Sequence, residues 1–239
     1  MIDLKGKNCF ITGATGGLGK EIALELALKG CNLFLTATND NKLADLCRSV
    51  SKESEQNISI FYKSADLNNL DDIKNVVLCA KEKMKQVDIL INCAGIFVIK
   101  DISDLEIEDY NNSFNINVRA PFILCKEFGK DMKDNGWGRI VNIGSSSAYD
   151  GFRGTSLYCS SKHALRGLSR SLYEEFRKSN VRVLFISPSS MDTEMGRLAI
   201  DQDFRTFIDP KEAAKYISFV ILFNDNMVVE DVQLKRLFL

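Results

Sequence analysis

Histidine is almost absent from this chain: His163 is the only one among 239 residues. A metal site built from several histidines is therefore excluded, and we expect no bound metal. A Ser–His triad would have to use His163, which we expect to point away from any site because it directly follows Lys162. The seven cysteines form no CxxC pair, so we interpret them as reduced thiols.

Long apolar runs and an excess of charge are also lacking. The longest apolar stretch, around residues 217–223, is too short to span a bilayer, and residues 1–7 do not form a signal peptide. The formal net charge is −1, with acids and bases interspersed. We therefore expect a cytoplasmic protein whose partners include neither nucleic acid nor a membrane.

The remaining composition fits one α/β domain. With 45% hydrophobic and 26% charged residues and no linker or repeat, residues 1–239 can bury a single core. Apolar runs predict strands at 8–12, 32–37, 58–62, 88–92, 138–143 and 181–186. Helical patterns alternate with them at about 18–29, 40–52, 69–84, 104–133, 156–178 and 210–223, and Pro121 predicts a kink in the fourth. This alternation predicts a Rossmann-type, doubly wound parallel sheet with helices on both faces.

A glycine-rich turn follows the first predicted strand. Gly13, Gly16, Gly17 and Gly19 stand between that strand and the next predicted helix. Glycines allow the backbone to approach a pyrophosphate closely, and a helix N-terminus offers unpaired N–H groups to its charge. A tight turn without a ligand is the alternative, but the flanking strand and helix favour a nucleotide site.

Three residues in the second half of the chain point to acid–base chemistry. Ser145 precedes Tyr158 by thirteen residues, and Lys162 follows Tyr158 by four. Residues four apart share one face of a helix, so the phenol and the ammonium are expected to lie together. Lowering a tyrosine pKa to neutrality requires roughly 4 kcal/mol. One cation about 4 Å away supplies this at an effective dielectric constant of about 20.

Several motifs together give the chain a family resemblance. It resembles the single-domain short-chain dehydrogenases/reductases of roughly 250 residues in the segments LKGKNCFITGATGGLG, NCAG (92–95), INVRAPF (116–122), GRIVNIGSSSAYDGFRGTSLYCSSKHAL (138–165) and VRVLFISPSSMDTEM (181–195). The resemblance covers nearly the whole length. It implies a reaction in which a carbonyl and a secondary alcohol are interconverted by hydride exchange with a nicotinamide cofactor.

The resemblance implies a catalytic tetrad of Asn117, Ser145, Tyr158 and Lys162. Tyr158 would exchange a proton with the substrate oxygen, and Ser145 would hold that oxygen by a hydrogen bond. Lys162 would bind the nicotinamide ribose and keep Tyr158 acidic. Asn117 would support a water relay to Lys162, although an asparagine inside a helix often only bonds the backbone.

The resemblance also implies a set of cofactor-binding residues. Besides Tyr158 and Lys162 these are Thr12, Gly13, Thr15, Gly16, Gly17, Leu18, Gly19, Thr38, Asp66, Leu67, Asn92, Ala94, Gly95, Pro188, Met191 and Thr193. Asn92 has an alternative role in tying adjacent strands together. Ala37 stands where NAD-specific members usually carry an acid, so we expect NADP(H) to be preferred, with NAD(H) possible.

Substrate and assembly are less closely defined. Ser145, Tyr149, Phe152, Met195 and Phe204 are expected to contact the substrate. A 3-oxoacyl thioester, as in 3-oxoacyl-acyl-carrier-protein reductases, is the leading substrate. The alternatives are a small hydroxy acid, a sugar or a diketone, and a scaffold that senses nucleotide without turnover. Helices 104–133 and 156–178 carry more apolar residues than one sheet face requires, so we expect a homodimer or homotetramer.

Overall fold

The computed structural model describes residues 1–54, 56–199 and 202–237. Within them, seven parallel strands form one sheet in the order β3-β2-β1-β4-β5-β6-β7. The strands are β1 (Asn8–Thr12), β2 (Asn32–Thr36), β3 (Ile60–Tyr62), β4 (Ile89–Asn92), β5 (Gly138–Ile143), β6 (Val181–Pro188) and β7 (Asp231–Leu234). The strand order reverses direction between β1 and β4. In open parallel sheets, ligands bind outside the carboxyl ends of the strands at this point.

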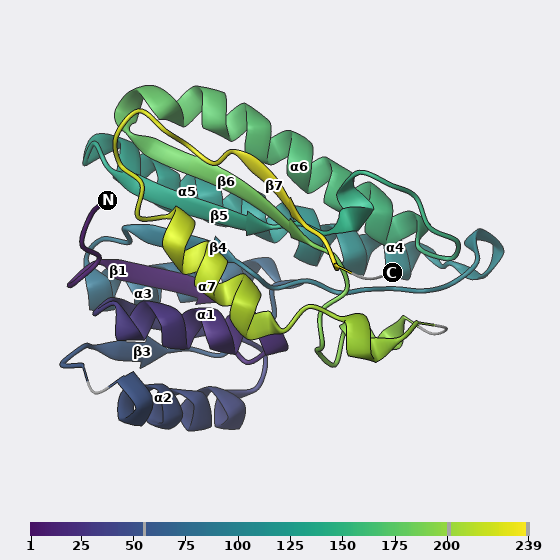
Figure 1. Ribbon diagram of the computed structural model, residues 1–239, viewed down its shortest axis with the longest axis horizontal. Helices are drawn as coiled ribbons and strands as arrows, with labels where there is room; N and C mark the ends of the chain where they lie inside the picture. The colour runs from purple at the N-terminus through teal and green to yellow at the C-terminus, as the bar shows by residue number, and fades with distance from the viewer. Residues whose placement is uncertain (55, 200–201, 238–239) are drawn as a thin grey trace.

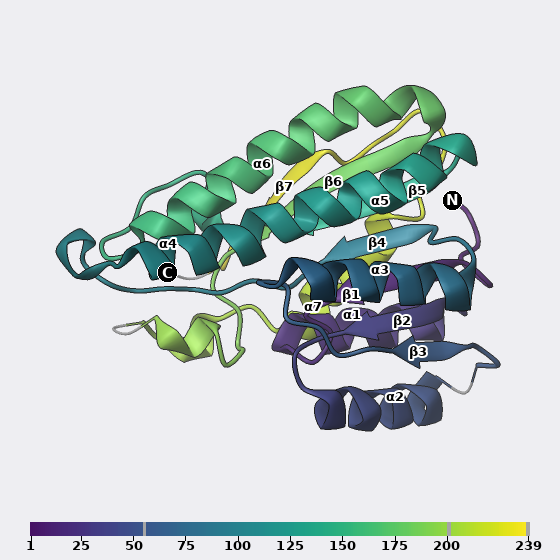
Figure 2. The same ribbon diagram turned by 180° about the vertical axis from the view of Figure 1, so that it is seen from behind.

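Helices cover both faces of the sheet, as predicted. On the face seen in Figure 1 lie α1 (Gly17–Leu28), α2 (Asp40–Ser54) and α7 (Pro210–Val220). On the opposite face, seen in Figure 2, lie α3 (Leu70–Met84), α5 (Ala120–Asp134) and α6 (Ser156–Phe176). Each layer has its own apolar core. Ile22 and Ile217 belong to the first core, and Phe10 and Phe128 belong to the second. Helices therefore cover both faces of the sheet, and the carboxyl ends of the strands remain available for a ligand site.

The helix expected at 104–133 is wrong as a continuous element. It consists of α4 (Ile107–Phe114), a π-helical turn at Asn115–Arg119 and then α5. The π turn lies directly before Pro121. Proline has no N–H to donate, so the α-helical bond to the carbonyl of Asn117 cannot form. The N–H of Ala120 instead bonds the carbonyl of Asn115. The expected kink at Pro121 is thus a π turn centred on a candidate catalytic residue.

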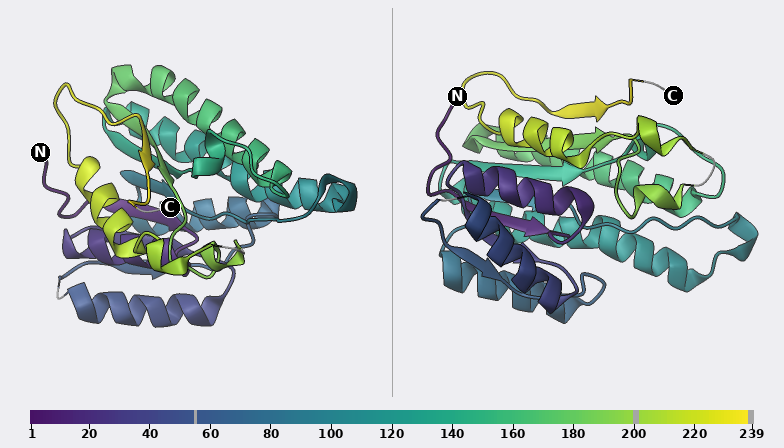
Figure 3. Two further views of the ribbon diagram at one scale, coloured as in Figure 1. Left: turned by 45° about the vertical axis from the view of Figure 1, so that its right-hand side comes forward. Right: turned by 60° about the horizontal axis from the view of Figure 1, so that its bottom comes forward.

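The strand β7 was not predicted. It is the yellow strand beside β6 in Figure 3, and it pairs with β6 in register from Phe185↔Asp231 to Pro188↔Leu234. Its sequence, DVQL, is short and half polar and lacks an apolar run. Because β7 is parallel to β6, the chain that follows Leu234 emerges at the carboxyl edge of the sheet.

Candidate active site

Two cavities meet at the carboxyl edge of the sheet. The first, which we call the glycine cleft, has a volume of about 400 Å³ and extends from Gly13 to Lys162. The second, the serine cavity, has a volume of about 530 Å³ and is lined by Ser145, Ser146 and Ser189. Both are lined by Gly144, Tyr158, Met191, Thr193 and Met195, so these residues form a shared wall. Two molecules bound in the two cavities would meet at Tyr158.

The glycine cleft is built around the turn between β1 and α1. Most of the expected cofactor-binding residues line it: Gly13, Thr15, Gly16, Gly17, Leu18, Gly19, Thr38, Asp66, Leu67, Ala94, Gly95, Tyr158, Lys162, Met191 and Thr193. Pro188 lines the serine cavity instead. Thr12 and Asn92 do not line either cavity. Segments that follow six strands, β1 to β6, thus line one cleft.

Two of the glycines are required by backbone geometry. Gly13 has φ +62°, and a Cβ there would lie 2.7 Å from the Cα of Ala94. A Cβ on Gly19 would overlap the Gly13 carbonyl oxygen. The turn therefore packs backbone against backbone and leads into the N-terminus of α1. The unpaired N–H groups and positive dipole end of this helix fit a diphosphate.

Thr12 and Asn92 support the cleft from inside the protein. The Thr12 hydroxyl accepts hydrogen bonds from the N–H groups of Cys93 and Ala94, both at 3.0 Å. The Asn92 amide donates to Asn142 Oδ1 at 2.7 Å and so ties β4 to β5. Both side chains are almost fully buried. Asn92 thus joins two neighbouring strands, which is the alternative role expected for it. Thr12 similarly joins β1 to the segment that follows β4.

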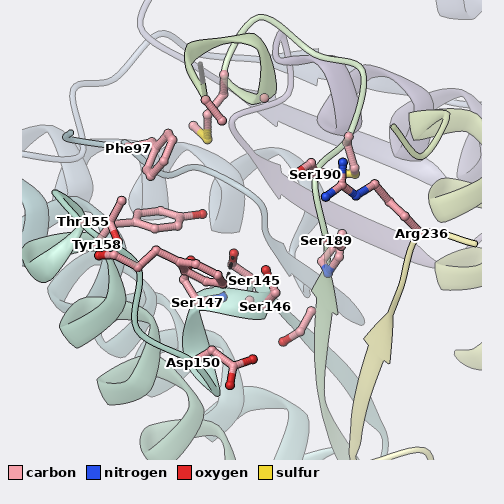
Figure 4. Close-up of a pocket in the computed structure, with 18 of the residues that line it drawn as sticks. Phe97, Ser145, Ser146, Ser147, Asp150, Thr155, Tyr158, Ser189, Ser190 and Arg236 are labelled. Atoms are coloured by element: carbon pink, nitrogen blue, oxygen red, sulfur yellow. Dashed lines mark hydrogen bonds between the residues drawn. The ribbon is translucent and has the colours of Figure 1, made fainter. Parts of the chain in front are cut away.

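Ser145, Tyr158 and Lys162 come together where the two cavities meet: Ser145 lines the serine cavity, Lys162 lines the glycine cleft, and Tyr158 lines both. Ser145 follows β5, while Tyr158 and Lys162 lie one turn apart on α6. The Lys162 ammonium donates a hydrogen bond to the Ile143 carbonyl at 2.8 Å and lies 5.6 Å from the centroid of the Tyr158 ring. The Phe97 ring packs edge-on against Tyr158, with 4.6 Å between centroids. Figure 4 shows Tyr158, Ser145 and Phe97 around the serine cavity.

Burial is the largest influence on the pKa values of Tyr158 and Lys162. It raises the pKa of the Tyr158 phenol to about 12, and a hydrogen bond with Ser145 acts in the opposite direction. It lowers the pKa of the Lys162 ammonium to about 8. Lys162 is not among the groups that shift the Tyr158 pKa here, and the expectation that its charge lowers that pKa stays a prediction. Desolvation dominates, and the ammonium directs its hydrogen bond to Ile143.

Asn117 is fully buried in the π turn and bridges two segments of the site. Its Oδ1 accepts from the N–H of Ile96 at 2.9 Å, and its Nδ2 donates to the Ile96 carbonyl at 3.0 Å. The same Nδ2 donates to Ser161 Oγ on α6, also at 3.0 Å. The side chain thus fastens the loop after β4 to the helix that carries Tyr158 and Lys162. This contact pattern supports the backbone-bonding alternative for its side chain.

The expected substrate residues divide into two groups. Ser145, Phe152 and Met195 line the serine cavity, whereas Tyr149 and Phe204 do not. The Tyr149 hydroxyl instead donates to Asp231 on β7, and the Phe204 ring packs against Phe207. Sequence reasoning missed Phe97 and Arg236, which also line the cavity. Phe97 lies two residues after NCAG, which was a usable signal. Arg236 is placed by the unpredicted strand β7.

The structure also bears on two expected absences. Within residues 1–54, 56–199 and 202–237, no cluster of three or more His, Cys, Asp or Glu side chains could hold a metal ion. The same part of the chain contains no helix long and apolar enough to cross a membrane. His163 does not line either cavity, and its Nδ1 lies 2.8 Å from the Cys159 carbonyl.

Comparisons with known proteins agree with this geometry. The family model described as short chain dehydrogenase matches residues 7–203. An uncharacterized oxidoreductase of Staphylococcus saprophyticus is 28% identical over 239 residues, covering 98% of this chain and 99% of that one. The 3-oxoacyl-(acyl-carrier-protein) reductase FabG of Rickettsia bellii is 33% identical over 195 residues, covering 82% and 77%. A Beutenbergia cavernae structure, described as an NAD(P)-dependent gluconate 5-dehydrogenase with NADP bound at low occupancy, has a TM-score of 0.87 at 25% identity, covering 97% of this chain and 96% of that one.

Proposed function

Because this chain belongs to the short-chain dehydrogenase family and is an oxidoreductase acting on alcohol or carbonyl groups, we propose that residues 1–239 form one catalytic domain that uses NADP(H). The observation that carries the proposal is the junction of the two cavities, where Tyr158 lines both, Ser145 lines the serine cavity and Lys162 lines the glycine cleft. The cofactor occupies the first cavity, and the carbonyl or alcohol substrate occupies the second.

The chain's own residues carry the proton side of the reaction. When bound, the nicotinamide supplies or accepts the hydride. Tyr158 donates a proton to the substrate oxygen during reduction and takes it back during oxidation. Ser145 holds the same oxygen by a hydrogen bond, because hydride transfer builds alkoxide character that needs a preorganised donor. Lys162 binds the nicotinamide ribose, and Asn117 holds α6 in place through Ser161.

The surroundings of β2 support a preference for NADP. Ala37 and Thr38 both line the glycine cleft at the end of this strand. An NAD-specific site presents an acid to the ribose hydroxyls at this place. The Asn39 side chain accepts a bond from the N–H of Lys42 at 2.9 Å, which fixes the start of α2 beside Thr38. The similar structure from Beutenbergia cavernae contains NADP.

A 3-oxoacyl thioester is the leading substrate, supported by the 33% identity to a 3-oxoacyl-(acyl-carrier-protein) reductase. A small hydroxy acid, or the corresponding oxo acid, is the second candidate. Most of the lining of the serine cavity is apolar, but it includes a group of polar side chains that favours this candidate: Ser145, Ser146, Ser189, Ser190, Gln233 and Arg236.

A screen of carbonyl compounds tests the proposal. The compounds are acetoacetyl thioesters, oxo acids, ketoses and diketones, each incubated with the protein and NADPH while the absorbance of the reduced cofactor is followed. We expect one class to consume NADPH with stoichiometric formation of the secondary alcohol. Absence of turnover in every class, with NADPH and with NADH, would contradict the proposed function.

A further inference from the structure

The serine cavity contains a cation from the C-terminal segment. The carbonyl of Leu234, the last residue of β7, accepts a hydrogen bond from the N–H of Ser189 at 2.8 Å. This pairing carries the next residues along the carboxyl edge of the sheet, beside the end of β6. Arg236 consequently lines the same cavity as Ser145 and Tyr158. Figure 4 shows it across the cavity from Tyr158, next to Ser190.

Neutral groups hold the Arg236 guanidinium in place. Its Nη1 donates to Thr206 Oγ1 at 3.1 Å, and its Cζ lies 5.3 Å from the centroid of the Phe207 ring. Its Nε is buried and finds no hydrogen-bond partner among the residues that the structure describes. A buried donor of this kind is costly unless a ligand or water satisfies it. The side chain is therefore oriented in advance and retains donors for a bound molecule.

The charge of the cavity also favours an anion. The charged residues that line it within the described parts of the chain are three cations, Arg153, Lys235 and Arg236, and one carboxylate, Asp150. Arg153 is highly exposed and lies 3.8 Å from Asp101, so its charge is partly matched at the mouth. A guanidinium presents two parallel N–H groups that fit both oxygens of a carboxylate.

We propose that Arg236 is a specificity-determining residue that binds a carboxylate of the substrate, so that the substrate is a small oxo acid or the hydroxy acid derived from it. The proposal rests on the proposed function and selects its second candidate substrate, the small oxo or hydroxy acid, over the 3-oxoacyl thioester. The carbonyl of such a molecule lies at Ser145 and Tyr158, and its carboxylate lies at Arg236 on the opposite wall. A carrier-bound 3-oxoacyl thioester has no free carboxylate near its oxo group.

Matched acids and esters test the proposal. The probes are 3-oxobutanoate, 4-oxopentanoate and 5-oxohexanoate, each compared with its methyl ester, which keeps the carbon skeleton and the oxo group but replaces the carboxylate with a neutral ester. Binding to the NADP⁺-saturated protein is measured by calorimetry, and kcat/KM is measured with NADPH. For at least one chain length we expect the acid to bind about tenfold or more tightly than its ester. In Arg236→Gln this ratio should fall to about one.

Two further variants keep the test decisive. Arg205→Gln is the matched control, since this exposed arginine is two residues from Phe207 but pairs with Asp203 outside the cavity, and it should retain the acid preference. Arg236→Lys keeps the charge but loses the fork, so it should retain only part of the preference. If Arg236→Gln fails to fold, the acid-to-ester binding ratio of Arg236→Lys tests the role of Arg236 instead.

The possible outcomes separate the two proposals. Equal binding of acid and ester at every chain length, or equal losses in Arg236→Gln and Arg205→Gln, overturns the role of Arg236. Acid-selective binding that depends on Arg236 supports that role even without turnover. In that case, the loss of turnover counts against the proposed function alone.

Discussion

Among single residues, Lys162 combines deep burial with a charge that the proposed mechanism uses. Only 4% of it is exposed, and burial lowers its pKa from 10.5 to about 8. Between these two values the unfolded chain binds more protons at this position than the folded protein does. The contribution of Lys162 to stability is therefore present above about pH 10.5 and is lost as the pH falls through about 8.

A comparison with Lys162→Met measures this contribution. Methionine keeps an unbranched stem but has no titratable group. Relative to this variant, the wild-type free energy of unfolding should rise by up to about 3 kcal/mol between pH 8 and 10.5. Urea unfolding of both proteins without cofactor, at several pH values, gives the difference. A difference that is independent of pH would show that the lysine is not desolvated as the structure has it.

Cofactor choice is expected to depend on Ala37 at the end of β2. Wild-type protein should use NADPH with a higher kcat/KM than NADH, because no carboxylate at this position repels the 2′-phosphate. Ala37→Asp should reverse the preference by about tenfold or more, since it adds a hydrogen-bond acceptor for the ribose and a like charge for the phosphate. Ala37→Asn serves as the control, because asparagine has about the same size as aspartate but carries no charge. A wild-type advantage for NADH would mean that Ala37 had been misinterpreted.

At the scale of elements, the turn from β1 into α1 depends on backbone packing more than on side chains. Gly19→Ala should remove cofactor binding and lower the melting temperature, because the added methyl group overlaps the Gly13 carbonyl oxygen. Gly16→Ala is the matched control: its Cβ would lie 3.2 Å from the same oxygen, which a small shift relieves. Titration of cofactor fluorescence and thermal unfolding distinguish the two. Equal effects of the two substitutions would contradict the geometry of the turn.

Sequence periodicity predicted the elements whose pattern is local. Strands such as β1 and β5 are apolar runs, and α1 is bounded by glycines, so each leaves a signal in its own residues. The strand β7 has no such run, because it gains stability by adding to the edge of β6. Arg236 was missed for the same reason, since only β7 brings it to the cavity.

The π turn shows a second limit of local reasoning. Pro121 predicts a disturbance in the helix but not its form. In the structure the turn directs Asn117 toward Ile96 and Ser161, which come from different segments. Tyr149 likewise does not line the serine cavity, because its hydroxyl donates a hydrogen bond to Asp231 on β7. These side-chain orientations depend on partners that are distant in the sequence, and the spacing of residues along the chain does not predict such partners.

For the whole molecule, we expect a homodimer or a tetramer built from dimers. Of the apolar residues on α4, α5 and α6, Leu124 and Leu165 are buried in the chain's own core. Ile107, Tyr110 and Phe122 remain exposed by 73%, 44% and 48%. Pairing through these helices would cover them. Light scattering at micromolar concentration should give at least twice the 26.8 kDa mass of one chain, and a monomeric mass would count against pairing.

The proposed reaction depends on Tyr158 as the proton donor beside a bound cofactor. Tyr158→Phe removes only the phenolic oxygen and keeps the ring that packs against Phe97. The most direct test measures kcat with NADPH and an accepted carbonyl substrate, together with NADPH affinity, for wild type and this variant. We predict that kcat falls at least about a hundredfold while the NADPH dissociation constant changes less than about threefold. A variant that retains more than about a tenth of the wild-type kcat would contradict the assignment.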